Sequence, residues 1–193
     1  MDCSFVDITT EFLAVAFHTI LYYSHIYPNS IFETRRKYNV VVYNCIHPEV
    51  SQYISLCLKS VRECLKSGQL RRVVFAITND AYEPVIKFVF DVFKSDHFDE
   101  TNDAYLIQTE QNLRAFCLHL SSNVDKLKCL PDDCSFTVYI HTNETMAVSL
   151  SVAPDSEEFP LVEICEINKE NEAIIPLRSF SIRNHSIESY IEL

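Results

Sequence analysis

Two strand-forming runs separated by a short polar break constrain the fold of this chain more than any other stretch. Val73–Thr78 and Val85–Phe93 are rich in β-branched and aromatic residues, and NDAYEP lies between them. Runs of this kind joined by turn residues predict a β-hairpin, with Pro84 where no ladder donor is needed. One face of the second strand is apolar and needs a cover of helices. The other face is only partly apolar and comprises Val85, Lys87, Val89, Asp91 and Phe93.

Periodicity predicts three helices and two further strands in one domain of 193 residues. The helices are expected at about Ser4–Tyr27, Pro48–Lys66 and Ala104–Ser122, and the strands at Val40–Tyr43 and Ser135–His141. From Asn29 to the first of these strands we expect a loop with short extended pieces. From Asp155 onward, apolar residues recur without a helical period, which indicates extended chain lying across another part of the fold. Together these elements predict an α+β fold.

Glycine content and net charge exclude several classes of protein. Gly68 is the single glycine, whereas phosphate-cradling loops, dinucleotide fingerprints and nucleophile elbows need glycine where backbone and ligand meet. The formal net charge is −11, which disfavours autonomous binding to DNA or RNA because phosphate backbones are repelled. The basic run Arg35–Lys37 could make a local contact with nucleic acid, but we favour a solvated loop.

The eight cysteines indicate free thiols in a reducing compartment rather than a secreted disulfide framework. No CxxC pair occurs and no signal-peptide pattern opens the chain. We therefore expect the protein in the nucleus or the cytosol. No membrane span is expected either, since the most apolar stretch is short and is interrupted by His18 and Thr19. His18 and His25 are interpreted as hydrogen-bonded or rim histidines rather than zinc ligands.

Nothing in the sequence favours an enzyme. Common hydrolase and metalloprotease motifs are absent from it, and we expect neither a metal nor a cofactor. Cys134 and His141 could suggest thiol chemistry, but they stand at the two ends of one predicted strand, about 20 Å apart. That separation is too great for direct pairing of a thiolate with its base. A thiol-dependent enzyme is therefore a disfavoured alternative.

Five segments carry a family resemblance: EFLAVAFHTILYYSHIYPNSIFETRRKYNV, HPEVSQYI, VIKFVF, EQNLRAF and CSFTVYIHT. They resemble the HORMA-domain family, and within it the branch formed by accessory subunits of the translesion DNA polymerase zeta. The resemblance implies three helices packed on an antiparallel sheet, followed by a C-terminal safety belt. It divides a single domain into a core at residues 1–142 and a belt at residues 143–193. In the closed state of such domains, the belt crosses the sheet and traps a partner peptide as an added edge strand.

The resemblance also implies a non-catalytic adaptor that captures a proline-containing peptide of the polymerase zeta catalytic subunit. The positions that match the family's peptide pocket are Tyr27, Tyr53, Phe136 and Leu161. A tyrosine ring offers a flat apolar face to a rigid prolyl ring at little entropic cost. The family usually has tryptophan at the position of Leu161, so the pocket is expected to be smaller here. For Tyr53, ordinary packing in the core is an equally good interpretation.

Two further surfaces follow from the resemblance. Ile174, Glu188 and Tyr190 match the positions that bind the deoxycytidyl transferase, the scaffold of translesion synthesis. Arg114, with Glu110 one turn earlier, matches the face that pairs with another HORMA protomer as a homo- or heterodimer. An ordinary solvated helix face explains these two residues equally well. An AAA+ remodelling ATPase is a further implied partner, although the chain begins close to its first expected helix, without the longer segment that such ATPases grip.

Two alternatives to the polymerase adaptor stay open besides the thiol enzyme. A checkpoint or chromosome-axis HORMA protein would use the same fold with a different peptide ligand. A DNA-binding module would need salt-dependent affinity for DNA, which the acidic charge disfavours. Under the adaptor hypothesis the protein is nuclear and makes no direct contact with nucleic acid or membrane.

Overall fold

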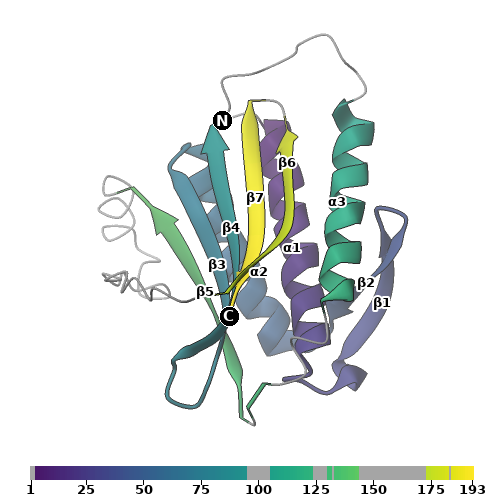
Figure 1. The fold of residues 1–193 in the computed structure, drawn as a ribbon, viewed down its shortest axis with the longest axis vertical. Coiled ribbons are helices and arrows are strands. Elements are labelled where there is room, and N and C mark those ends of the chain that lie inside the picture. The colour runs from purple at the N-terminus through teal and green to yellow at the C-terminus, as the bar shows by residue number, and fades with distance from the viewer. Residues whose placement is uncertain (1–2, 95–104, 124–129, 132, 144–172, 183) are drawn as a thin grey trace.

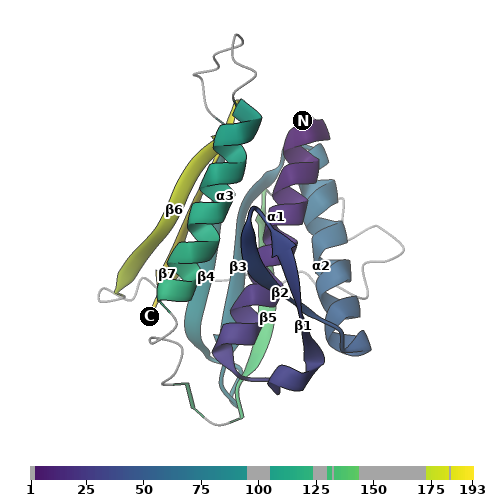
Figure 2. The same ribbon diagram turned by 90° about the vertical axis from the view of Figure 1, so that its right-hand side faces the viewer.

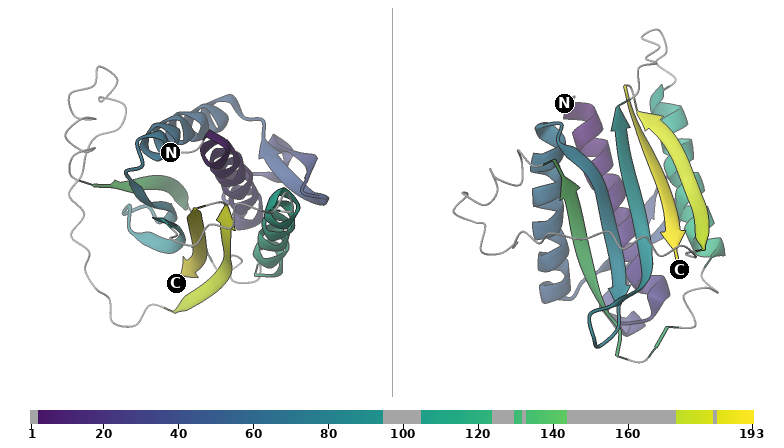
Figure 3. Two further views of the ribbon diagram at one scale, coloured as in Figure 1. Left: turned by 90° about the horizontal axis from the view of Figure 1, so that it is seen from above. Right: turned by 60° about the vertical axis from the view of Figure 1, so that its left-hand side comes forward.

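A five-stranded antiparallel sheet with three helices on one of its faces forms the body of the structure (Figures 1, 2 and 3). The computed structural model describes residues 3–94, 105–123, 130–131, 133–143, 173–182 and 184–193. In chain order the elements are α1 (Cys3–Ser24), the 3-10 turn η1 (Asn29–Ile31), β1 (Phe32–Lys37), β2 (Val40–Cys45), α2 (Pro48–Lys66), β3 (Leu70–Thr78), β4 (Pro84–Lys94), α3 (Tyr105–Ser122), β5 (Ser135–Thr142), β6 (Ile174–Ile182) and β7 (His185–Glu192).

The predicted hairpin, β3 with β4, lies at the centre of a sheet whose strand order is β5-β3-β4-β7-β6. Phe75 of β3 is opposite Phe88 of β4. β5 pairs with the other side of β3, and the C-terminal hairpin of β6 and β7 pairs with β4 through β7. The α+β fold with helices packed on an antiparallel sheet is thus confirmed. The boundary between core and belt stays a prediction, since residues 144–172 lie outside the described residues.

Local sequence explains why α2 begins and ends where it does. Its first residue is Pro48, whose missing N–H would have no helical partner at that position. After the last turn, Gly68 adopts a φ of 72°. The N–H of Gly68 donates to the carbonyl of Leu65, and the N–H of Gln69 donates to the carbonyl of Cys64, both at 3.0 Å. This pair of bonds is a Schellman motif, which favours glycine because the left-handed conformation strains other residues.

Phe12 of α1 joins four elements in the core. Its ring meets Phe90 of β4, Phe116 of α3 and Phe180 of β6, at centroid distances of 5.9, 4.8 and 5.2 Å. All three contacts are edge-on, an arrangement that suits the quadrupoles of aromatic rings. By length and composition alone, Ser4–Ser24 qualifies as a candidate membrane span. Phe12 and its apolar neighbours are nevertheless fully buried inside the fold, as expected of a core helix.

The segment after Asn29 is more regular than the predicted loop. β1 and β2 form a separate antiparallel hairpin with Thr34 opposite Tyr43. Tyr38 and Asn39 join the two strands with φ angles of 50° and 58°, as in type I′ turns, which usually contain glycine. The expectation of a loop was wrong because Tyr38 gives no turn signal. Its hydroxyl donates to Glu11 of α1 at 3.2 Å, and this contact helps to hold the turn.

The sheet face away from the helices is more buried than the alternation along β4 indicated. Val74, Ala76 and Val89 form a small apolar cluster there, and Tyr139 and Tyr190 pack against it. Only 1% of the Val89 surface is exposed. The sequence pattern of one strand cannot show this burial, because neighbouring strands supply the covering side chains.

Five cysteines of the described residues are free thiols, as predicted: Cys45, Cys57, Cys64, Cys117 and Cys134. Burial raises the pKa of the Cys57 and Cys64 thiols to about 11 and that of Cys117 to about 12. These three thiols therefore stay protonated and unreactive at neutral pH.

His18 is a buried hydrogen-bond acceptor. Its Nδ1 accepts the N–H of Cys45 at 3.2 Å, which confirms the interpretation as a hydrogen-bonded histidine. Burial penalises the charged imidazolium and lowers the pKa of His18 from 6.5 to about 4. The side chain is therefore neutral throughout the physiological pH range.

This lowered pKa predicts that His18 destabilises the fold in weak acid. Below pH 6.5 the unfolded chain binds a proton at His18, but the folded chain does so only near pH 4. The free energy of unfolding therefore falls by about 3 kcal/mol as the pH drops through this window. Urea unfolding at about pH 7 and about pH 4.5 measures the loss, which should shrink by about 2 to 3 kcal/mol in His18→Gln. The exposed His25→Gln serves as control, and an unchanged pH dependence in His18→Gln would contradict this account.

Candidate functional site

β5 lies at one end of the sheet, and among the described strands it has a neighbour on one side only. That neighbour is β3, where Phe75 is opposite Val138 and Val73 is opposite Ile140. Along an antiparallel ladder, successive residues turn their N–H and C=O groups alternately toward and away from a given partner. Half of the main-chain groups of β5 therefore face the outer edge, where another strand could pair.

A hydrogen bond from α2 identifies which residues face this edge. The N–H of Val138 donates to the hydroxyl of Tyr53 at 3.4 Å, so it points away from β3. By alternation, Phe136 and Ile140 turn their main-chain groups in the same direction. The side chains of Phe136 and Val138 are buried on the helix side of the sheet. The edge thus offers a main-chain ladder beside a group of packed apolar and aromatic side chains.

Three aromatic side chains from separate stretches of the chain meet beside this edge, at positions that were predicted to form the peptide pocket. The ring of Phe136 lies edge-on to Tyr53 at 5.4 Å and to Tyr27 at 6.2 Å, and it stacks on Phe75 at 5.1 Å. Tyr27 and Tyr53 are both half-buried. Burial raises the pKa of Tyr27 and raises that of Tyr53 to about 12, so both hydroxyls are neutral and able to hydrogen-bond. The arrangement suits an extended peptide that carries a rigid apolar side chain.

The structure brings together three of the four residues predicted for a peptide pocket, namely Tyr27, Tyr53 and Phe136. Leu161 lies outside the described residues. The ring of Tyr53 packs against the core, as one of its two interpretations expects, and its hydroxyl reaches the strand edge. Peptide binding at these residues stays a prediction.

The three residues predicted to bind a scaffold share one face of the C-terminal hairpin. Ile174 is opposite Glu192 across β6 and β7, and Glu188, Tyr190 and Glu192 alternate along β7. Opposite residues and alternate residues of a sheet lie on the same face. Ile174, Glu188 and Tyr190 are therefore together on the side away from the helices. Ile174 is 63% exposed, and its binding of a scaffold stays a prediction.

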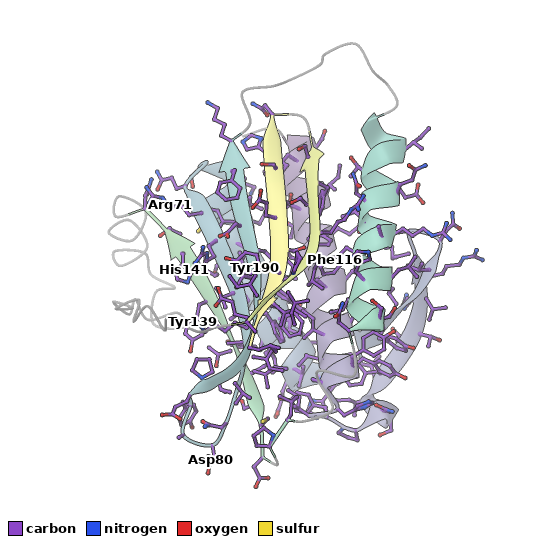
Figure 4. All side chains as sticks on the ribbon, in the orientation of Figure 1. Arg71, Asp80, Phe116, Tyr139, His141 and Tyr190 are labelled. Carbon is purple, nitrogen blue, oxygen red and sulfur yellow. The ribbon has the colours of Figure 1, made fainter. Side chains whose placement is uncertain are left out.

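Tyr190 also belongs to a polar network on this helix-free face of the sheet (Figure 4). Its hydroxyl donates to Oδ2 of Asp91 at 3.0 Å, and Arg72 holds the same carboxylate through two nitrogens at 2.6 and 3.2 Å. Burial and the bond to Asp91 raise the pKa of Tyr190. A second ion pair, Lys87 with Glu192 at 3.1 Å, joins β4 to β7. Together these contacts fix the C-terminal hairpin on the central strands.

The ion pair between Arg72 and Asp91 was not predicted from the sequence. Their register is set by the β3–β4 hairpin, which places them directly opposite each other. An acidic residue in an otherwise apolar strand, opposite an arginine of its hairpin partner, was the available signal.

The predicted pairing face of α3 is exposed. Glu110 and Arg114 both lie on the outer side of the helix. Ile107 and Leu118 extend the same stripe at helical spacing and are 63% and 50% exposed. Neither residue was predicted to belong to this face, although their helical spacing from Arg114 can be read from the sequence. Exposed apolar residues on one helix face are typical of protein interfaces, and pairing through this face stays a prediction.

The basic run on β1 forms ion pairs within the chain. Arg35 pairs with Glu33, and Lys37 pairs with Glu11 of α1 at 2.9 Å. These side chains are substantially exposed, so the contacts are surface pairs of small energetic weight. The run therefore resembles a solvated surface more than a binding site for nucleic acid.

Comparison with known families agrees with this architecture. The model of the HORMA domain matches residues 6–173. The chain belongs to the HORMA-domain family. This HORMA domain is 35% identical over 188 residues to human "Mitotic spindle assembly checkpoint protein MAD2B", covering 96% of this chain and 89% of the relative.

Two further relatives carry names that refer to a polymerase. The Drosophila melanogaster "DNA polymerase zeta subunit 2" is 27% identical over 158 residues, covering 81% of this chain and 79% of the relative. The Schizosaccharomyces pombe "DNA polymerase zeta processivity subunit" is 28% identical over 143 residues, covering 70% and 67%.

Solved structures confirm the fold. A chain of the mitotic checkpoint complex has a TM-score of 0.82 at 20% identity and covers 98% of this chain and 98% of its own. Caenorhabditis elegans HTP-2 bound to a HIM-3 closure motif has a TM-score of 0.70 at 10% identity, covering 97% and 89%. At such low identity these likenesses establish the HORMA fold alone.

The Arg72–Asp91–Tyr190 network predicts energetic coupling between the C-terminal hairpin and β4. Asp91→Ala should lower the free energy of unfolding by about 1 to 3 kcal/mol, because it leaves Arg72 and Tyr190 without their shared acceptor. Tyr190→Phe should lower the free energy of unfolding by about 1 kcal/mol on its own, and by much less when it is added to Asp91→Ala. Urea unfolding of the single and double variants measures this coupling. Glu33→Ala, which breaks a surface ion pair, should destabilise the protein far less than Asp91→Ala does. Additive effects of Asp91→Ala and Tyr190→Phe would refute the network.

Proposed function

We propose that this HORMA domain is a non-catalytic adaptor subunit of DNA polymerase zeta. It captures a proline-containing peptide of the polymerase catalytic subunit and bridges it to the deoxycytidyl transferase scaffold of translesion synthesis. The observation that carries the proposal is the outer edge of β5 beside the pocket of Tyr27, Tyr53 and Phe136. The names of the fruit fly and fission yeast relatives support polymerase zeta as the assembly that it serves.

Capture proceeds by strand addition. The peptide exchanges main-chain hydrogen bonds with Phe136, Val138 and Ile140, and these bonds supply affinity without regard to side chains. Selectivity comes from the prolyl ring, which packs on the tyrosines of the pocket and loses little entropy because it is already rigid. The stacking of Phe136 on Phe75 gives the pocket a firm base in the core.

The position of the C-terminal hairpin supports slow release of the peptide. β5 and β6 lie at opposite ends of the sheet. We propose that the segment that joins them, with the hairpin after it, is the safety belt. A ligand that leaves only after such a belt opens dissociates slowly, because a large rearrangement precedes its departure.

The outer face of the hairpin, with Ile174, Glu188 and Tyr190, is the proposed surface for the scaffold. Its position is supported by the shared strand face and by the exposure of Ile174. The α3 stripe around Arg114 and Glu110 is proposed to pair with a second HORMA protomer, and opening of the belt would be the step for an AAA+ ATPase. Work on damaged DNA implies a nuclear location.

A checkpoint or chromosome-axis adaptor is the second candidate. The name of the human relative, a mitotic spindle assembly checkpoint protein at 35% identity, supports a checkpoint role. The same edge and pocket would serve a different peptide, so relative affinity for the two kinds of peptide distinguishes the candidates. A thiol enzyme has less support, since buried thiols stay protonated and the Cys134 thiol donates to the carbonyl of Pro131 at 3.2 Å.

The pocket predicts a large effect of Tyr53→Ala on peptide capture. Loss of the ring should weaken binding of a fluorescent proline-containing polymerase peptide by about 1 to 3 kcal/mol, as expected of an aromatic anchor. Fluorescence anisotropy measures this affinity. Tyr82→Ala is the matched control, because Tyr82 lies in the turn between β3 and β4 and is 80% exposed. The Tyr53→Ala protein should still bind the transferase domain, because this substitution leaves the outer face of the C-terminal hairpin intact. Unchanged peptide affinity in a folded Tyr53→Ala protein would remove Tyr53 from the site.

A further inference from the structure

The Tyr53 hydroxyl accepts a hydrogen bond from a main-chain N–H of β5 that an added strand would need for pairing. Its oxygen accepts the N–H of Val138 at 3.4 Å, and Cys57, one turn further along α2, helps to raise its pKa. The raised pKa of Tyr53 favours the neutral hydroxyl, which can donate to the thiol sulfur while it accepts from Val138. The hydroxyl is therefore fixed between the helix and the strand.

Val138 is the middle residue of the outward-facing set on β5. Phe136 and Ile140 stand two residues before and after it, with their main-chain groups turned the same way. A strand that pairs along all three must offer a carbonyl to the Val138 N–H. In the free protein that position is taken by a side chain, so the edge is partly protected against strands that pair without discrimination.

We propose that the Tyr53 hydroxyl holds the place of the peptide carbonyl on Val138 and is displaced when a strand adds to β5. This inference rests on the proposed function, since it concerns how the same peptide site opens. Tyr53 then has two opposed effects on binding. Its ring favours a peptide with a side chain that packs in the pocket, whereas its hydroxyl imposes a cost on every incoming strand. A strand without a suitable ring therefore gains little by pairing.

Tyr53→Phe separates the two effects, because it keeps the ring and removes the hydroxyl. In the free protein, the amide of Val138 should exchange with solvent deuterium about tenfold faster than in the wild type, since it has lost its acceptor. The same variant should bind the proline-containing peptide about threefold to tenfold more tightly, which is the value of one hydrogen bond no longer given up. Its association rate constant should rise as well. Tyr82→Phe is the matched control and should leave Val138 exchange and peptide binding as in the wild type.

Three results would overturn the inference. Unchanged exchange at Val138 in Tyr53→Phe would show that the hydroxyl does not cover this amide. Unchanged peptide affinity would show that displacement carries no cost. Weaker binding, of the size expected for Tyr53→Ala, would show that the hydroxyl belongs to the bound complex. If the wild-type protein binds no such peptide, the proposed function fails, whereas hydrogen exchange still decides whether Tyr53 covers Val138.

A second variant guards against a change in packing around the new phenylalanine. Cys57→Val removes the thiol that neighbours Tyr53 on α2 and keeps an apolar side chain in the core. It should raise Val138 exchange and peptide association in the same direction as Tyr53→Phe, but by a smaller factor. An opposite change in either measurement would count against the inference.

Discussion

The pairing of β7 with β4 decides which edge of this sheet is open. β3 and β4 form a central hairpin, and each has one remaining side on which another strand can pair. The C-terminal hairpin takes the side of β4 along a ladder from Lys87 opposite Glu192 to Lys94 opposite His185. β5 takes the side of β3, and its own outer edge is then where the described sheet ends. The docking of the C-terminal hairpin on β4 thus leaves the outer edge of β5 without a neighbour among the described strands.

Contacts on both faces of the sheet hold the hairpin in that place. On the helix side, Phe180 of β6 packs on Phe12 of α1, and the carbonyl of Leu177 lies 2.8 Å from Nδ1 of His119 in α3. On the other side, Asp91 joins Arg72 and Tyr190. Apolar burial supplies most of the energy, while the buried polar contacts fix the register. A slip by one residue would turn every side chain of β7 to the wrong face.

The sequence predicted the elements whose signals are local. The central hairpin and α2 follow from alternation, from helical spacing and from Gly68, all of which act over a few residues. β1 was missed because Tyr38 adopts a positive φ without being a usual turn residue. The regular pairing of β6 and β7 was not predicted in detail either, since extended chain near an edge acquires its register from tertiary contacts.

The candidate site was predictable in part for the same reason. Tyr27, Tyr53 and Phe136 were named through the family resemblance. Their meeting at one edge depends on contacts between the segment after α1, helix α2 and strand β5, which no sequence pattern encodes. The hydrogen bond between Tyr53 and Val138 could not be predicted from the sequence, because it depends on the direction in which the amides of β5 point. The Arg72–Asp91 pair likewise required the exact register of the hairpin.

The dissociation rate of a fluorescent proline-containing peptide from the full chain tests the central claim most directly. The peptide is taken from the polymerase zeta catalytic subunit of the same organism and is chased with an excess of unlabelled peptide. A ligand paired with β5 beneath a closed belt should leave over minutes or longer, because the belt must open first. Release within seconds, from a protein shown to be folded, would contradict capture by strand addition under a belt.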